Sequence, residues 1–107
     1  MELRQIKYFL AICEERSFTR AARRCRVARP SLTESIQKLE SELGHALFHR
    51  GHRSRNTEIS EFGRLLKPCF IAVVKAIEEA RELAASFAMR KPMQKDEGAG
   101  LIEQCDQ

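Results

Sequence analysis

The chain has 107 residues, a formal net charge of +4 and a hydrophobic fraction of 43%, which suit one small folded domain. Its longest apolar run, Phe70–Val74, is far shorter than the ~20 residues that cross a membrane, so we expect no membrane span. No apolar segment follows the start of the chain, so we expect no secretory signal and a cytoplasmic location. The four cysteines form no CxxC pair, and we expect reduced thiols.

Positive charge is concentrated toward the start of the chain. Residues 1–91 hold 18 basic and 11 acidic residues, whereas residues 92–107 hold 1 and 4. Six arginines and no acidic residue lie between Arg16 and Arg29, and Arg50, Arg53 and Arg55 form a second cluster. Two separate clusters favour a polyanion such as nucleic acid as the partner, although a solvated basic surface would have the same composition.

Three helices are predicted in the first 43 residues. Apolar residues recur at helical spacing over residues 2–15, and Ser17 is a good N-cap for a second helix. Pro30 should interrupt that helix and begin a third, which Gly44 ends. Two helices joined by a short turn predict a helix-turn-helix. The side chains expected in the core are Leu3, Ile6, Phe9, Leu10, Cys13, Phe18, Ala21, Ala22, Cys25, Leu32, Ile36, Leu39 and Leu43.

A wing is predicted next. The apolar run 46–48, a polar stretch and Ile59 indicate a short strand and a hairpin with an arginine-rich tip.

A long helix, capped by Ser60, should then run to about Arg90. Apolar residues repeat in it at alternating spacings of four and three, as in a coiled-coil seam. The predicted dimerisation residues are Phe62, Leu66, Cys69, Val73, Ala76, Ala80, Leu83 and Phe87. We expect a homodimer; the alternative is that this helix folds back along its own domain. Pro68 should kink or divide the helix.

Several motifs occur in a characteristic order: MELRQIKYF at residues 1–9, SFTRAA at 17–22, PSLT at 30–33, ELG at 42–44, LFHR at 47–50 and ISEFG at 59–63. With these motifs, the first 90 residues resemble the N-terminal DNA-binding region of LysR-type bacterial transcription regulators. The resemblance implies a winged helix-turn-helix, a linker helix that pairs two subunits, and DNA binding as a dimer or a dimer of dimers.

The chain departs from this pattern at Ala28, Arg29 and Glu34, which lie on the expected reading surface, so the target sequence stays open. Members of the family continue into a two-lobed domain that binds a small-molecule inducer, and nothing after Arg90 resembles it. We therefore expect no effector site in this chain, which would be a DNA-binding-only protein, a truncated reading frame or an excised piece.

We thus predict a mainly α fold, with a winged helix-turn-helix domain at residues 1–59, a linker and dimerisation helix at 60–90 and a disordered tail at 91–107. With Leu32 at the centre of the buried face, the outward side of the third helix would enter a major groove. The predicted DNA-binding residues are Thr19, Arg20, Arg29, Pro30, Ser31, Thr33, Glu34, Gln37, Lys38, Arg50, Arg53 and Arg55.

The expected partner is double-stranded DNA, read as an interrupted palindrome. A second hypothesis is an interaction subunit that forms heterodimers with full-length relatives and modulates them. No catalytic motif is present, so we expect no enzyme. His45, His49 and His52 are closely spaced but have no accompanying metal motif, so we expect no metal and no cofactor.

Overall fold

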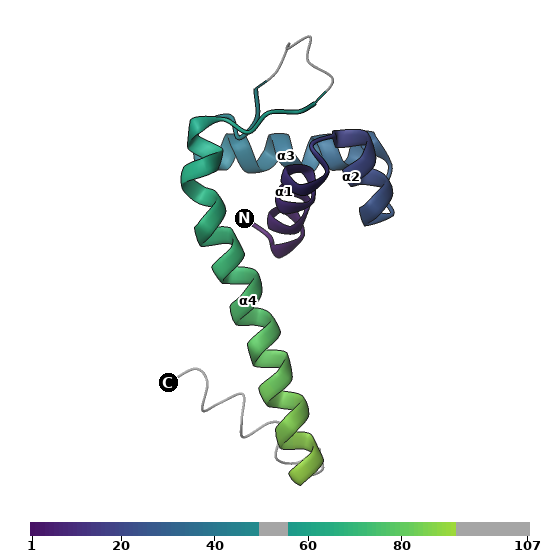
Figure 1. Ribbon diagram of the computed structural model, residues 1–107, viewed down its shortest axis with the longest axis vertical. Coiled ribbons are helices and arrows are strands. Elements are labelled where there is room, and N and C mark those ends of the chain that lie inside the picture. Colours follow the sequence, from purple (N-terminus) through teal and green to yellow (C-terminus); the bar gives the residue numbers. More distant parts are fainter. Residues whose placement is uncertain (50–55, 92–107) are drawn as a thin grey trace. The chain divides into compact units, whose positions relative to one another are not determined.

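The computed structural model describes residues 1–49 and 56–91, and Figure 1 shows the four helices of these residues. Helix α1 spans Leu3–Glu15, α2 spans Phe18–Cys25, α3 spans Arg29–Leu43 and α4 spans Glu61–Arg90. The chain divides into one unit from Met1 to Val74 and a second that begins at Lys75, and α4 contributes to both. This mainly α architecture with a long last helix confirms the predicted fold class.

Capping residues next to the first three helices define where these helices begin or end. The Ser17 hydroxyl accepts a hydrogen bond from the Arg20 backbone N–H at 3.1 Å, which confirms the predicted N-cap of α2. Gly44 ends α3 with a φ of 90° and donates its N–H to the Glu40 carbonyl at 2.8 Å. Arg16 and Arg26 end α1 and α2 with φ of 56° and 59°, a left-handed conformation that disfavours a side chain.

A three-residue turn joins α2 to α3. Helix α3 begins at Arg29, one residue earlier than predicted, so Pro30 occupies its second position. A proline is tolerated there because the first N–H groups of a helix have no intrahelical acceptor. Ala21 and Ala22 are buried, as expected for small residues on the inner side of the motif.

The core of the first unit is centred on aromatic rings from distant parts of the chain. The Phe9 ring of α1 lies 5.4 Å from the Phe48 ring and 5.3 Å from the Phe70 ring of α4. The apolar stripes predicted to face the core on α2 and α3 are confirmed, but the stripe predicted on α1 contains too few residues. Because α2 and α3 both pack on α1, its Tyr8, Ala11 and Ile12 are buried as well.

The root of the wing is held by a single antiparallel bridge between Phe48 and Ile59. The His49 N–H donates to the Glu58 carbonyl at 2.9 Å, and the Ser60 N–H donates to the Leu47 carbonyl at 2.9 Å. The strand expected over residues 46–48 is therefore a bridge, with no strand among the described residues. The arginine-rich tip, residues 50–55, lies outside them.

Helix α4 starts at the cap predicted for it, because the Ser60 hydroxyl accepts from the Gly63 N–H at 3.0 Å. It continues through Pro68, so the expected division is wrong. A proline removes one backbone hydrogen bond, here at the Arg64 carbonyl, and Phe70 just beyond it is anchored in the core. None of the described helices is long and apolar enough to span a membrane.

The N-terminus is also part of the first unit. The Met1 amino group lies 2.6 Å from the Glu42 carboxylate near the end of α3, in a partly exposed ion pair.

Candidate nucleic-acid interface

The orientation of α3 is set by its inner stripe. Leu32, Ile36 and Leu39 are fully buried, so the opposite side of the helix must face outward. Pro30, Ser31, Glu34, Gln37 and Lys38 are exposed there, and Thr33 is half-buried at the edge. The predicted reading side of α3 is thus the exposed side.

The first turn of α3 keeps its backbone donors unblocked. Ala28 is the N-cap residue, and it has no side-chain hydrogen bond to the first turn. Arg29 is exposed at the first helical position. Uncapped N–H groups at a helix start favour an anion, and the guanidinium adds a formal charge beside them.

The start of α2 is arranged differently. Thr19 is exposed, but the Arg20 guanidinium donates to the Glu15 carbonyl and lies 3.9 Å from the Glu15 carboxylate. Arg20 would have to leave this neighbour, or extend from it, to reach a phosphate.

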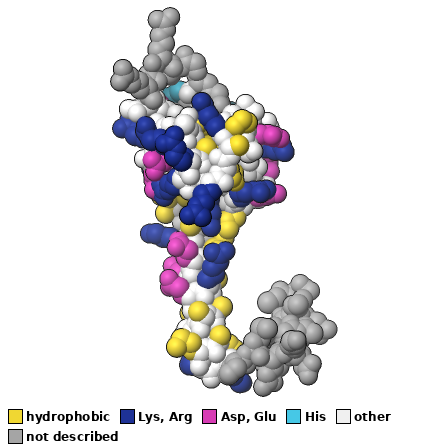
Figure 2. All heavy atoms as spheres, turned by 90° about the vertical axis from the view of Figure 1, so that its right-hand side faces the viewer, with side chains coloured by type: hydrophobic (Ala, Val, Ile, Leu, Met, Phe, Trp, Pro, Cys, Tyr) yellow, Lys and Arg dark blue, Asp and Glu magenta, His cyan; other side chains and the backbone are white. Residues whose placement is uncertain are grey.

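Ion pairs divide the basic residues of this region into two groups. Arg24 donates to Glu14 at 2.7 Å, and this hydrogen bond raises the pKa of Arg24 above its already high usual value. Arg23, Arg26 and Arg29 form no ion pair within residues 1–49 and 56–91, so their charges are not locally neutralised. Figure 2 shows Lys and Arg side chains gathered on the face of the molecule that carries α2.

Glu34 is paired with a neighbour on its own helix. Its carboxylate lies 3.3 Å from the Lys38 ammonium, and both side chains are largely exposed. An exposed pair at this spacing contributes only a few tenths of a kcal/mol, ~0.3–0.5, so a nearby ligand can readily replace it.

A polar hollow beside α3 was not anticipated from the sequence. It encloses about 480 Å³, and Arg4 and Tyr8 of α1 line it together with Ser31, Glu34 and Lys38 of α3. Arg4 therefore lies close to the outward side of α3. No local signal could have found it, because the two helices meet only through tertiary packing.

The wing arginines Arg50, Arg53 and Arg55 lie outside the described residues, as does His52. The described part of the chain contains no group of three His, Cys, Asp or Glu side chains that could hold a metal ion.

The apolar residues of α4 fall into two sets. Phe62, Leu66, Phe70 and Val74 pack on the core of their own chain. Phe62 and Leu66, the first members of the predicted seam, are therefore partly used within the chain. The later members are exposed in the single chain: Cys69, Val73, Ala76, Ala80, Leu83 and Phe87.

Known proteins are similar to this chain in sequence. Residues 3–64 match the family described as bacterial regulatory helix-turn-helix protein, lysR family. The chain is 40% identical over 88 residues to the HTH-type transcriptional regulator BudR of Klebsiella aerogenes, covering 78% of this chain and 60% of BudR. It is 51% identical over 57 residues to the regulator BenM of Acinetobacter baylyi, covering 53% of this chain and 19% of BenM.

Solved structures are also similar to this chain in fold. The BenM DBD/catB site 1 DNA complex is similar with a TM-score of 0.77 and 36% identity, over 82% of this chain and 96% of that chain. The CbnR DBD–DNA complex is similar with a TM-score of 0.74 and 31% identity, over 82% and 99% of the two chains. The chain thus spans domains solved with DNA, but only part of the length of its curated relatives.

Proposed function

This chain belongs to the lysR family of bacterial regulatory helix-turn-helix proteins, and on that premise we propose that it is a transcription regulator that binds a specific sequence of double-stranded DNA. The observation that carries the proposal is the geometry of α3. Its inner stripe is fully buried, while an uncapped first turn faces outward with Arg29, which forms no ion pair with the described residues. We place its action in the cytoplasm.

In this proposal, α3 lies in the major groove and reads base edges. Arg29 would donate two hydrogen bonds to guanine, and Gln37 would pair with adenine. Glu34 has two possible roles: its carboxylate accepts from the amino group of cytosine, or it repels phosphate and weakens binding to every sequence. The exposed pair with Lys38 is compatible with both roles, because the pair is weak.

The flanking contacts come from two other places. Thr19 and Arg20 would approach phosphates at the start of α2, where Arg20 must first release Glu15. The wing arginines Arg50, Arg53 and Arg55 would enter the neighbouring minor groove, where arginine favours narrow A·T-rich segments.

Dimerisation through α4 would complete the site. The exposed members of the seam, from Cys69 to Phe87, supply an apolar surface that a second copy could cover. A two-fold axis between the copies would make the target an interrupted palindrome. The same surface would accept a full-length relative, and co-expression followed by size-exclusion chromatography distinguishes the mixed dimer from the homodimer.

The proposal is tested by selecting a target from random duplex DNA and measuring affinity at several salt concentrations. We expect log K to fall with log salt by about 0.9 for each phosphate contacted, whereas an affinity independent of salt would contradict DNA binding. Arg29→Ala should lose about 1–3 kcal/mol of discrimination at one base position. Arg81→Ala, with the same charge change on α4, should leave base preference unchanged.

Glu34→Gln separates the two roles of that residue. If Glu34 reads cytosine, the variant loses preference at one position, and if Glu34 repels phosphate, the variant binds all sequences more tightly.

A further inference from the structure

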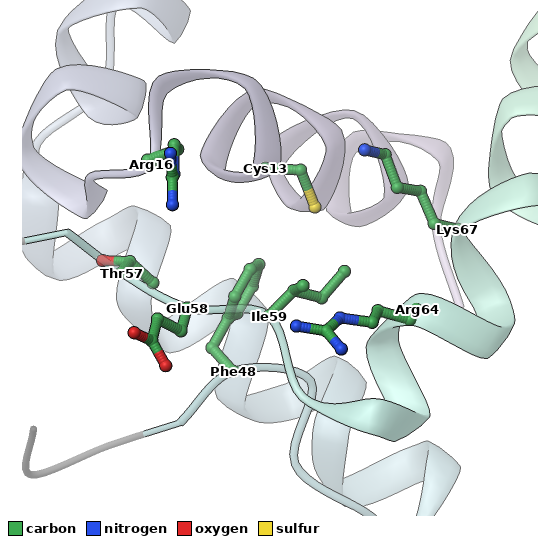
Figure 3. A pocket seen from close by; sticks show the side chains of 8 residues that line it. All are labelled: Cys13, Arg16, Phe48, Thr57, Glu58, Ile59, Arg64 and Lys67. Atoms are coloured by element: carbon green, nitrogen blue, oxygen red, sulfur yellow. The ribbon is translucent and has the colours of Figure 1, made fainter.

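A pocket lies beneath the root of the wing, on a different part of the first unit from the outward side of α3. Figure 3 shows it between the end of α1, the wing root and the first turns of α4. Its volume is about 270 Å³, just below the usual range for small-molecule sites of about 300–1,000 Å³. A ligand of this pocket must therefore be small.

The pocket combines an apolar floor with basic walls. Phe48 is buried and Ile59 is half-buried, and these two side chains come from the bridge that holds the wing root. Arg16, Arg64 and Lys67 line the same pocket, and Figure 3 shows the Arg64 guanidinium reaching toward Ile59. None of these three cations forms an ion pair within the described ranges 1–49 and 56–91. We name this site the basic pocket.

Little negative charge within the pocket offsets these cations. Cys13 also lines it, and burial raises the pKa of its thiol to about 11, against a smaller opposite effect of Lys67, so the thiol is neutral. Among the described residues that line the pocket, Glu58 is the one acidic residue, and its side chain is exposed. In Figure 3 the Glu58 carboxylate lies on the opposite side of the wing-root segment from Cys13.

We propose that the basic pocket binds a small organic anion, a carboxylate with a short apolar body. The carboxylate would accept a hydrogen bond from Arg64, with Arg16 and Lys67 adding positive charge on the other walls, while the body would cover Phe48 and Ile59. A DNA backbone fits these features less well, because phosphates need an open row of cations and gain nothing from a recessed apolar floor. This site does not depend on the DNA-binding proposal.

The conformation of Arg16 provides a way to test its side chain. Arg16 ends α1 in the left-handed region, with φ of 56°, where glycine would be free of strain. Arg26 ends α2 in the same conformation, so the backbone of Arg16 reflects the end of its helix. The conformation supplies a variant that separates binding from folding, because Arg16→Gly removes the guanidinium and relieves the strain together.

The test is isothermal titration calorimetry on the full chain with sodium hexanoate as the probe. Hexanamide, which has the same body without the charge, and inorganic phosphate, which has charge without the body, serve as matched probes. We expect saturable binding of hexanoate and much weaker binding of both others. Arg64→Gln should weaken hexanoate binding about tenfold, the size of one lost charge-assisted hydrogen bond.

Two variants control for charge and for folding. Arg23→Gln removes an exposed arginine that lies outside the pocket and forms no ion pair in the described part of the chain, and it should leave hexanoate binding unchanged. Arg16→Gly should weaken binding while its melting temperature stays at or above that of the parent chain.

Three results would overturn the proposal: no saturable binding of hexanoate, equal binding of hexanamide or phosphate, and an equal loss in Arg23→Gln. If the first of these is accompanied by a loss of DNA affinity in Arg64→Gln, these cations belong to a DNA-backbone contact instead.

Discussion

Two parts of the molecule are built from similar amphipathic helices but treat their apolar side chains in opposite ways. From Met1 to Val74, the chain buries a shared core of its own: Phe9 is fully buried, and thirteen hydrophobic residues form one core, while Leu65 and Val73 on α4 stay exposed. From Lys75 onward, α4 leaves its apolar side chains exposed to solvent, with Leu83 72% exposed and Phe87 53% exposed. Helical periodicity therefore identifies an apolar stripe without saying whether the same chain covers it.

The difference also concerns what keeps each part helical. Isolated helices shorter than about 12–15 residues are marginal in water, and most helical stability in proteins comes from packing. Helices α1 to α3 have that packing within one chain. The part of α4 after Val74 gains it only when its exposed stripe is covered, which is the role that the proposed dimer gives to a second copy.

The largest expected effect is at the centre of the core. Phe9→Ala removes the ring that contacts both Phe48 and Phe70, and should lower the free energy of unfolding by about 3–5 kcal/mol. Urea denaturation followed by circular dichroism measures this loss. Phe87→Ala is the matched control: at a protein concentration where the chain is monomeric, it should change stability little. Equal losses in the two variants would remove the contrast between the two parts.

The next effect concerns the surface of α4. Val73→Glu places a charge on the proposed seam, where Val73 is 41% exposed, and should raise the dimer dissociation constant about a hundredfold, equal to ~2.7 kcal/mol. Sedimentation velocity over a range of concentrations measures it. Lys75→Glu puts a glutamate on the other side of the helix and should keep the dimer. If Val73→Glu dimerises like the parent chain, the proposed register of the seam is incorrect.

Two glycines give a smaller contrast within the first unit. A Cβ atom on Gly63 would lie 2.5 Å from the Leu47 carbonyl oxygen and 2.7 Å from Ile59 Cγ1. Gly63→Ala must therefore displace the wing root, and should cost about 1–3 kcal/mol. Gly44→Ala meets no neighbouring atom and should cost about 1 kcal/mol, from the φ of +90° alone. In thermal unfolding, the melting temperature of Gly63→Ala should be lower than that of Gly44→Ala, and the reverse order would contradict the close approach at Gly63.

The smallest effect is the loss of a cap. Ser17→Ala removes the hydrogen bond to the Arg20 N–H and should cost about 1 kcal/mol. Ser41→Ala, at an exposed position inside α3, should be neutral or slightly stabilising, because alanine is the better helix former. A chemical denaturation series on both variants checks this pair, and equal midpoints would mean that the cap contributes nothing.

The features that sequence predicts well here are local ones. Ser17, Gly44 and Ser60 act at the helix ends where their chemistry places them, and the stripe on α3 identifies its outward side. Each of these depends on residues within one or two helical turns.

The features that it misses are contacts between distant segments. The Glu40 carboxylate accepts the Leu47 N–H at 2.7 Å and so fixes the chain after α3, but nothing near Glu40 signals this. Phe70 is not a member of the predicted seam of α4, yet its ring contacts that of Phe9 in the core. Arg4 and the basic pocket depend on where α1 lies against α3 and α4, which no local pattern specifies.

The ion pair at the first residue has a practical consequence for handling this protein. Glu42 puts a negative charge near the C-terminal, negative end of the α3 dipole, and the Met1 amino group offsets that charge. Blocking this amine, with a formyl group or with an affinity tag fused before Met1, would remove the positive charge and leave Glu42 uncompensated. Protein prepared for DNA-binding measurements should therefore carry its tag at the other terminus and a free α-amine at Met1.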